Sequence, residues 1–247
     1  MAESPLNRLV RRLDVDTSPL SEGEKQAILR LPVTMREIGP DQDIVREGDQ
    51  PSQCCVVLEG FQCRYKMLRD GERQIMSFHV PGDIPDLQSL FLATMDHSLG
   101  TITPNRVGFV THDALRDLIR QHPGLAERLW RETLIDAAIF REWITNVGSR
   151  DAYTRIAHLI CEFFVRLRSV GLTNGTTFNF PITQTEIADA TGLSTVHVNR
   201  SIQQIRADGL LSLERGICTI PDFGRLKDAA MFDPNYLHLS GAASAAA

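Results

Sequence analysis

Residues 182–206 read Ile-Thr-Gln-Thr-Glu-Ile-Ala-Asp-Ala-Thr-Gly-Leu-Ser-Thr-Val-His-Val-Asn-Arg-Ser-Ile-Gln-Gln-Ile-Arg and decide the fold of this part of the chain. Thr183 and Glu186 have the spacing of a capping box, Gly192 supplies a turn, and Ser194 is an N-cap for a second helix. Two helices joined by such a short turn predict a helix-turn-helix.

The second helix has two sides of different character. At about 100° per residue, Val198, Ile202 and Ile205 fall in one narrow arc, which predicts the buried side. The opposite side carries groups suited to base edges, namely Val196, His197, Asn199, Arg200 and Gln203. A guanidinium can bridge guanine O6 and N7, an amide can bridge adenine, and a small apolar group suits a thymine methyl. A polar helix face is usually only solvated, so the turn pattern carries the prediction that this face reads DNA.

A hairpin follows the two helices. Residues 210–213 and 217–220 predict two short strands joined by a turn, which together form a wing, and Arg215 at its tip is a candidate phosphate contact. An exposed hairpin arginine is more often merely solvated. The net charge is −5, but no acidic residue lies between Ala190 and Ala207, so a local anion-facing surface is compatible with the composition. The predicted DNA-contacting residues are Thr183, Gln184, Ser194, Thr195, Val196, His197, Asn199, Arg200, Gln203 and Arg215.

Residues 32–110 predict an antiparallel roll. Glycines cut short apolar runs at intervals of mostly 8 to 12 residues, and Asp70-Gly71 is a tight-turn dipeptide. The one long interval, 82–100, predicts an inserted short helix capped by Asp86. The adjacent Cys54 and Cys55 would alternate faces on a strand, so one of the two is expected to be exposed.

A long helix is predicted from Gly124 to about Gly148, and a further helix from Ala152 to about Val170. The apolar residues of the long helix cover more than one stripe, so it must bury a second face, either against another copy of the chain or within a single-chain core. The residues assigned to a dimer face are Leu129, Trp130, Leu134, Ala137, Phe140 and Ile144.

The composition excludes several classes of protein. A chain of 247 residues with 43% hydrophobic residues suits one large or two small globular domains. The five cysteines form no C-x-x-C pair, which argues against a disulfide framework or a four-thiolate metal site. No apolar run is long enough to cross a bilayer and no secretory leader is visible, so we expect a cytoplasmic protein without a membrane partner. No phosphate loop or nucleophile motif is present, so no enzyme is predicted.

The order of roll, long helix and winged helix-turn-helix resembles the Crp/Fnr family of bacterial transcription regulators. The segments that carry the resemblance are 44–48, 58–60, 81–83, 155–157 and 183–206 with its wing. The resemblance implies an α+β fold with a cyclic-nucleotide-binding-like sensory domain at 1–123, a dimerisation helix at 124–149 and a winged helix-turn-helix at 150–231, followed by a tail at 232–247. It also implies a homodimer whose recognition helices enter successive major grooves of a two-fold-symmetric site in double-stranded DNA. Activation of transcription would add a contact with RNA polymerase.

The chain departs from the family pattern in two places. Aligned to the family, the effector pocket would comprise Asp86, Leu87, Gln88, His97 and Ser98. Leu87 and His97 replace the glutamate for the ribose and the arginine for the cyclic phosphate, so cAMP is not expected and no cofactor is identified. Val196 stands where many members have a glutamate that accepts from cytosine, so the DNA half-site should differ. The alternative function is a cyclic-nucleotide-binding regulatory subunit that does not act on DNA.

Overall fold

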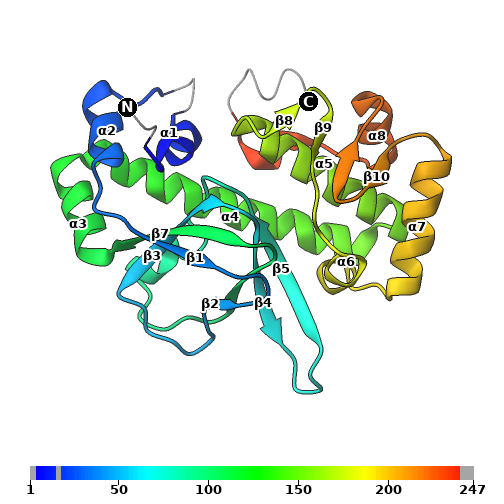
Figure 1. Cartoon of the computed structure of the whole chain (residues 1–247), viewed down its shortest axis with the longest axis horizontal. Coiled ribbons are helices and arrows are strands. Elements are labelled where there is room, and N and C mark those ends of the chain that lie inside the picture. The colour runs from blue at the N-terminus through cyan, green and yellow to red at the C-terminus, as the bar shows by residue number, and fades with distance from the viewer. Residues whose placement is uncertain (1–3, 15–17, 240–247) are drawn as a thin grey trace. The chain divides into compact units, whose positions relative to one another are not determined.

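The computed structural model describes residues 4–14 and 18–239, and these divide into two compact units. The first unit comprises Met1–Lys66 and Ser77–Ala137, and the second comprises Met67–Met76 and Ala138–Ala247. The α+β class and the predicted order of roll, long helix and winged helix-turn-helix are confirmed (Figure 1).

The first unit is the predicted roll with short helices. The strands of the roll are β1 (Thr34–Ile38), β2 (Asp43–Val45), β3 (Gln53–Glu59), β4 (Gln62–Met67), β5 (Arg73–His79), β6 (Ser98–Thr101) and β7 (Asn105–Thr111). The last residue of β4 and the first four of β5 belong to the stretch Met67–Met76 that is grouped with the second unit. They form two sheets, with the orders β1-β7-β3 and β2-β6-β4-β5. Gly60 joins β3 to β4 with a φ of 87°, and a Cβ there would lie 2.5 Å from the carbonyl oxygen of Pro104. Only glycine fits this connection.

Helices precede, interrupt and follow the strands of the roll in the sequence, and they contribute to one of its two hydrophobic cores. They are α1 (Asn7–Leu13), α2 (Glu22–Leu29), the 3₁₀ helix η1 (Leu87–Leu90), α3 (His112–Gln121) and the long helix α4 (Pro123–Ser149). Leu6, Ile28, Cys54, Leu90 and Leu125 belong to one buried cluster that joins these elements to β3. A second cluster, which includes Cys55, lies on the other side of that strand. β3 is therefore covered on both faces.

This double cover corrects one expectation about the cysteines. Both Cys54 and Cys55 are 0% exposed, whereas the sequence predicted that one of them would be exposed. Burial raises the pKa of the Cys54 thiol to about 12. Strand alternation separates the two side chains as expected, but each face has its own core, so neither thiol meets solvent.

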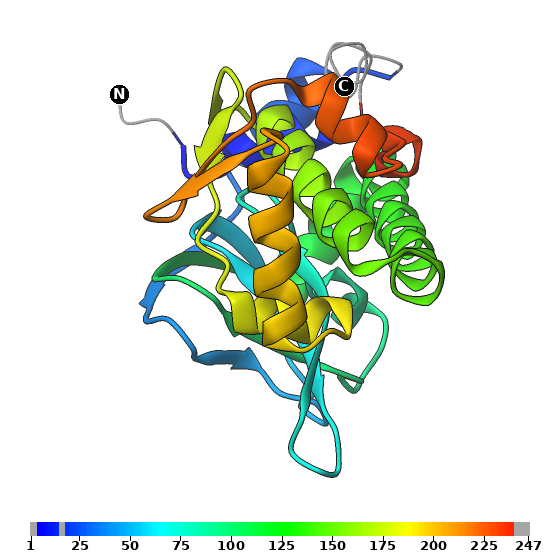
Figure 2. The same ribbon diagram turned by 90° about the vertical axis from the view of Figure 1, so that its right-hand side faces the viewer.

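The second unit holds the C-terminal helices and a small sheet. The helices are α5 (Ala152–Ser169), α6 (Gln184–Thr191), α7 (Thr195–Ala207), α8 (Phe223–Ala229) and the 3₁₀ helix η2 (Pro234–Leu237). The strands β8 (Thr173–Asn174), β9 (Thr177–Asn179), β10 (Ser212–Glu214) and β11 (Ile217–Thr219) form a sheet in the order β10-β11-β9-β8. Figure 2 shows α6 and α7 as two separate helices, coloured yellow to orange.

The expected tail at 232–247 is in part a packed segment. Phe232 and Leu237 are 3% and 2% exposed, and the Tyr236 hydroxyl donates to Glu162 Oε2 over 2.7 Å. Residues 240–247, which include the predicted frayed end at 242–247, lie outside the described residues.

Candidate nucleic-acid interface

Local hydrogen bonds fix the ends of α6 and α7. Thr183 Oγ1 accepts from the Glu186 amide over 3.2 Å, and Glu186 Oε2 accepts from the Thr183 amide over 2.6 Å. Gly192 ends α6 with a φ of 64°, and Ser194 Oγ accepts from the His197 amide over 3.3 Å to start α7. These contacts confirm the predicted capping box, turn and N-cap.

The inner side of α7 also matches its prediction. Val198 and Ile205 are 0% exposed and Ile202 is 3% exposed. Burying these three side chains fixes the rotation of the helix about its own axis, so the opposite side must face outward.

The outer side of α7 carries the predicted base-reading residues. Thr195, Val196, His197, Asn199, Arg200 and Gln203 are all exposed. Asn199 Nδ2 donates to Gln184 Oε1 over 3.2 Å, which ties α7 to the first turn of α6. Within the described residues, the side chains of Arg200 and Gln203 have no hydrogen-bond or ion-pair partner. Their donors are therefore available to a ligand without breaking an internal contact.

The wing is built as expected. β10 pairs antiparallel with β11, Arg215 lies in the connecting turn with a φ of 50°, and its side chain is exposed. β11 continues the pairing onto β9, so the hairpin is attached to a sheet and is not isolated. This anchoring limits the motion of the turn that carries Arg215.

Arg155 joins α5 to the turn between α6 and α7. Its Nη1 donates to the carbonyl of Thr191 over 2.6 Å, and its Nη2 donates to the carbonyl of Arg150 over 2.8 Å. The carbonyl of Thr191 lies at the end of α6, where backbone acceptors lack helical partners. Arg155 thus helps to hold the two-helix motif on α5.

A buried carboxylate that the sequence reasoning missed connects three elements of the second unit. Glu162 on α5 is 1% exposed, and its Oε2 accepts from Trp143 Nε1 of α4 over 3.0 Å. Tyr236 of η2 donates to the same oxygen, while Arg166 Nη1 donates to Oε1 over 3.2 Å. A Glu-x-x-x-Arg spacing on α5 was the only sequence signal, because the other two partners are distant in the chain.

A second charged group lies near the start of α5. Glu142 Oε1 lies 2.6 Å from Arg150 Nη2 and 3.2 Å from His158 Nε2. The close approach of His158, together with Arg150, lowers the pKa of Glu142 to about 2. These pairs join the C-terminal part of α4 to the linker at Arg150 and to His158 on α5.

The five expected effector-pocket residues lie together in the roll. Asp86, Leu87 and His97 are buried, and Gln88 and Ser98 are half-buried. Gln88 Nε2 lies 3.3 Å from His97 Nε2, and Ser98 Oγ accepts from the Glu47 amide over 3.1 Å. These polar groups are engaged with one another and with the backbone.

Asp86 does not cap the short helix that follows it, which corrects the sequence expectation. Its Oδ1 accepts instead from the Cys55 amide on β3 over 2.8 Å, and no side-chain capping bond is made to η1. The second carboxyl oxygen, Oδ2, is buried without a hydrogen-bond partner. Burial raises the pKa of Asp86 to about 7. Its carboxyl thus ties the start of η1 to β3, the last strand in the order β1-β7-β3.

Arg64 is a buried cation of the roll that the sequence reasoning did not single out. Its side chain is 4% exposed, and Nη1 donates to Asp136 Oδ2 of α4 over 2.7 Å. A second donor, Nη2, bonds to the carbonyl of Pro85, next to the expected effector set. The chain therefore supplies its own carboxylate to a guanidinium inside the roll.

The predicted dimer-face residues of α4 separate into two groups. Trp130, Leu134 and Ile144 are 67%, 55% and 73% exposed, whereas Ala137 and Phe140 are half-buried. Leu129 is 6% exposed and belongs to the buried cluster of the first unit. Leu129 is used by the core of its own chain, so it is not available to a partner.

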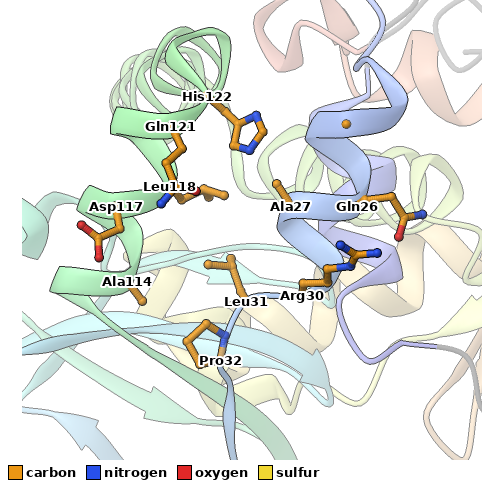
Figure 3. A pocket seen from close by; sticks show the side chains of 11 residues that line it. Gln26, Ala27, Arg30, Leu31, Pro32, Ala114, Asp117, Leu118, Gln121 and His122 are labelled. Atoms are coloured by element: carbon orange, nitrogen blue, oxygen red, sulfur yellow. The ribbon is translucent and has the colours of Figure 1, made fainter.

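A surface groove of about 630 Å³ lies between α2 and α3 (Figure 3). Ala27, Leu31 and Leu118 lie between the two helices, and Arg30 and Asp117 are at its rim. None of the five expected effector-pocket residues lines this groove, so the groove is separate from the expected effector pocket. Among the described residues, no helix is both long and apolar enough to span a membrane.

Two known domain families match the chain in consecutive segments. The cyclic nucleotide-binding domain matches residues 35–122, and the Crp-like helix-turn-helix domain matches residues 154–229. The first segment contains the roll, and the second contains α5, α6, α7 and the wing.

Individual proteins resemble the chain over most of its length. The transcriptional activator protein FnrL of Cereibacter sphaeroides is 26% identical over 216 residues, which cover 85% of each chain. The nitrogen fixation regulation protein FixK of Rhizobium meliloti is 26% identical over 176 residues, covering 70% of this chain and 76% of that protein. The structure of FixK2 from Bradyrhizobium japonicum is similar with a TM-score of 0.73 and 24% identity, covering 81% of this chain and 98% of that chain.

The cyclic nucleotide-binding domain precedes the Crp-like helix-turn-helix domain in the chain, and the second domain contains a capped helix pair whose outer face is exposed and mostly polar. The chain belongs to the Crp/Fnr family of transcription regulators.

Proposed function

We propose that this regulator binds DNA as a homodimer on a two-fold-symmetric site and reads each half-site with the outer face of α7. The observation that carries the proposal is the exposed polar set on that face. Asn199 bonds to Gln184, while Arg200 and Gln203 have no internal partner among the described residues. These side chains can bond base edges in the major groove, while Arg215 on the wing suits a backbone phosphate. Thr183, Gln184 and Ser194 lie at the helix starts, where amide groups and short polar side chains suit phosphates.

The exposed apolar row on α4 supports the homodimer. At about 100° per residue, Trp130, Leu134 and Ile144 fall within an arc of about 80° on one side of α4. Large apolar side chains gathered along one helix face mark an interaction surface, and an identical helix is complementary to it by symmetry. Ala137 lies in the same row and allows close approach. Leu129 is excluded from this face, because it is in the core.

We propose the same assignment of functions to segments of the chain as the sequence predicted. We assign residues 1–123 to a sensory domain, 124–149 to the dimerisation helix, 150–231 to DNA binding and 232–247 to a C-terminal extension. The protein has no catalytic role in this scheme, and it acts in the cytoplasm, where bacterial DNA is found. The activator names of its relatives support a contact with RNA polymerase when it is bound to DNA.

The proposed control does not involve cAMP. Leu87 offers no acceptor for a ribose hydroxyl, and burial lowers the pKa of His97, so this imidazole is neutral at pH 7 and cannot replace a guanidinium. The guanidinium of Arg64, whose Nη2 bonds to the carbonyl of Pro85 beside this set, is already paired with Asp136. An effector of another class, or none, is compatible with this interior.

The function is tested by selection from a random pool of DNA duplexes, with purified protein and no added small molecule. Salt must be held near the physiological value, because phosphate contacts alone give non-specific binding. Enrichment of a two-fold-symmetric sequence is expected for the wild type, and its loss with unchanged melting is expected for Arg200→Ala. If the pool is not enriched, the selection is repeated with cAMP and with cell extract. Failure there as well would favour a regulatory subunit without DNA function.

A further inference from the structure

The first turn of α7 presents one apolar side chain among polar ones. Val196 is 70% exposed and so contributes little to the core of its own unit. A single exposed valine is ordinary on a protein surface. Valine is also a weak helix former, because its β-branched side chain loses χ1 freedom in a helix. Neither core packing nor helix stability therefore explains this residue at this position.

The position of Val196 on the helix is what gives it a role. At about 100° per residue, Val196 lies within about 60° of Asn199, Arg200 and Gln203, in the middle of the exposed arc. Val198, Ile202 and Ile205 fix the rotation of that arc by being buried. Any base that Arg200 or Asn199 can reach is therefore adjacent to a base that faces Val196.

The chemistry of valine restricts what it can recognise. Its side chain neither donates nor accepts hydrogen bonds, so the amino groups of cytosine and adenine and the acceptors of guanine gain nothing from it. The C5-methyl group of thymine is the one apolar feature that a base pair shows in the major groove.

We propose that Val196 is a specificity-determining residue that selects a 5-methylpyrimidine, thymine in ordinary DNA, at one position of each half-site. This inference rests on the proposed function, since it needs α7 to lie in the major groove. Contact with one methyl group is expected to favour thymine over uracil or cytosine by about threefold to fivefold per half-site.

The test removes only the methyl group. A duplex carrying the selected site is made with uracil in place of each thymine in turn, symmetrically in both half-sites, and binding is measured for the wild type and for Val196→Ala. The wild type is expected to lose affinity at one position by about threefold to fivefold per half-site, and Val196→Ala is expected to lose much less there. Placing cytosine and then 5-methylcytosine at that position should weaken and then restore wild-type binding.

Two further results separate the possible failures. Val196→Glu should change the preferred base at that position to cytosine, because a carboxylate accepts from its amino group. If a symmetric site is selected but no uracil substitution matters, or if the methyl effect is the same in Val196→Ala, the role of Val196 is wrong and the regulator proposal stands. If no site is selected at all, the proposed function itself fails. Val196 is exposed, so both variants are expected to fold.

Discussion

Arg64 on β4 and Asp136 on α4 form an ion pair of 2.7 Å that joins the roll to the long helix within the first unit. The guanidinium is 4% exposed and the carboxylate is 32% exposed, so the pair is shielded on the arginine side only. A buried guanidinium needs a carboxylate or an equivalent anion. The roll thus contains a cation whose partner belongs to the helix that follows the sensory domain.

Removing that carboxylate should destabilise the first unit. We expect Asp136→Ala to lower the free energy of unfolding by about 2 kcal/mol. This is less than the ~3 to 5 kcal/mol lost when a fully buried pair is broken, because Asp136 is partly exposed. Asp117→Ala is the control, since Asp117 pairs with Arg120 on the surface of α3 and should cost less than about 0.5 kcal/mol. Denaturant unfolding gives both values, and equal losses would contradict a special role for Asp136.

Glu162 should be sensitive to a change of one atom. Glutamine in its place keeps one acceptor oxygen, so Trp143 and Arg166 can no longer both be satisfied, and we expect a loss of about 2 kcal/mol. Tyr236→Phe removes one donor but leaves the carboxylate, so it should cost only about 1 kcal/mol.

The indole of Trp143 reports on this contact directly. The chain has two tryptophans, so Trp130→Phe leaves Trp143 as the only one. In that background, Glu162→Gln should shift the emission maximum and Tyr236→Phe should leave it unchanged. An emission shift of the same size in both variants would rule out the assigned contact.

Two buried groups of the roll should give opposite pH dependences. Burial raises the pKa of Asp86 to about 7, so between about 4 and 7 the folded state keeps a proton that the unfolded state releases, and stability falls as pH rises. Burial lowers the pKa of His79 to about 4, so between about 4 and 6.5 the unfolded state binds the extra proton, and stability rises with pH.

Variants at these positions separate the two effects. Relative to the wild type, Asp86→Asn should gain about 6 to 12 °C in melting temperature as pH rises from about 4.5 to 7.5. His79→Gln should show the reverse trend, with its relative gain at the acidic end. If the melting temperatures of the wild type and Asp86→Asn change with pH in the same way across this range, Asp86 is ionised in the folded protein.

The exposed row of α4 predicts a change of mass in solution. Leu134→Glu places a carboxylate in the middle of the proposed dimer face and should weaken association at least tenfold, or about 1.4 kcal/mol. Light scattering across a dilution series should then show the mass of one chain at concentrations where the wild type has twice that mass. Gln121→Glu on α3 adds the same charge outside α4 and should not change the mass. A wild type that is monomeric at all concentrations would refute the dimer.

Arg200 and Arg215 should affect DNA binding in different ways. Arg200→Ala is expected to cost about 1 to 3 kcal/mol and to relax the preference at one base pair. Arg215→Ala should weaken binding to all duplexes about equally and reduce the salt slope by about 1, as expected for a phosphate contact. Binding titrations at several salt concentrations distinguish these outcomes. A sequence-dependent loss for Arg215→Ala would assign it to base reading instead.

The parts of this fold that sequence could predict are those fixed by neighbours in the chain. Thr183, Glu186, Gly192 and Ser194 act on backbone groups within three or four residues, so the helix-turn-helix followed from their spacing. The buried side of α7 followed from helical periodicity for the same reason.

The parts that sequence could not predict depend on distant partners. Asp86 satisfies the rule for an N-cap, but the amide of Cys55, 31 residues earlier, takes its carboxylate. Leu129 fits the apolar pattern of a dimer face equally well as Trp130, and only the packing of the first unit separates them. The hydrogen bonds of Glu162 to Trp143 and Tyr236 likewise span 19 and 74 residues.

Because all five cysteines are buried, their thiols can report separately on the opening of the two units. Cys54, Cys55 and Cys63 lie in the roll, and Cys161 and Cys218 lie in the second unit, all without solvent access in the folded state. A thiol reagent can modify them only when the surrounding structure opens, so the labelling rate of each set times the opening of its own unit. Mass spectrometry of the labelled peptides, with and without DNA, would then show in which unit DNA binding slows the labelling.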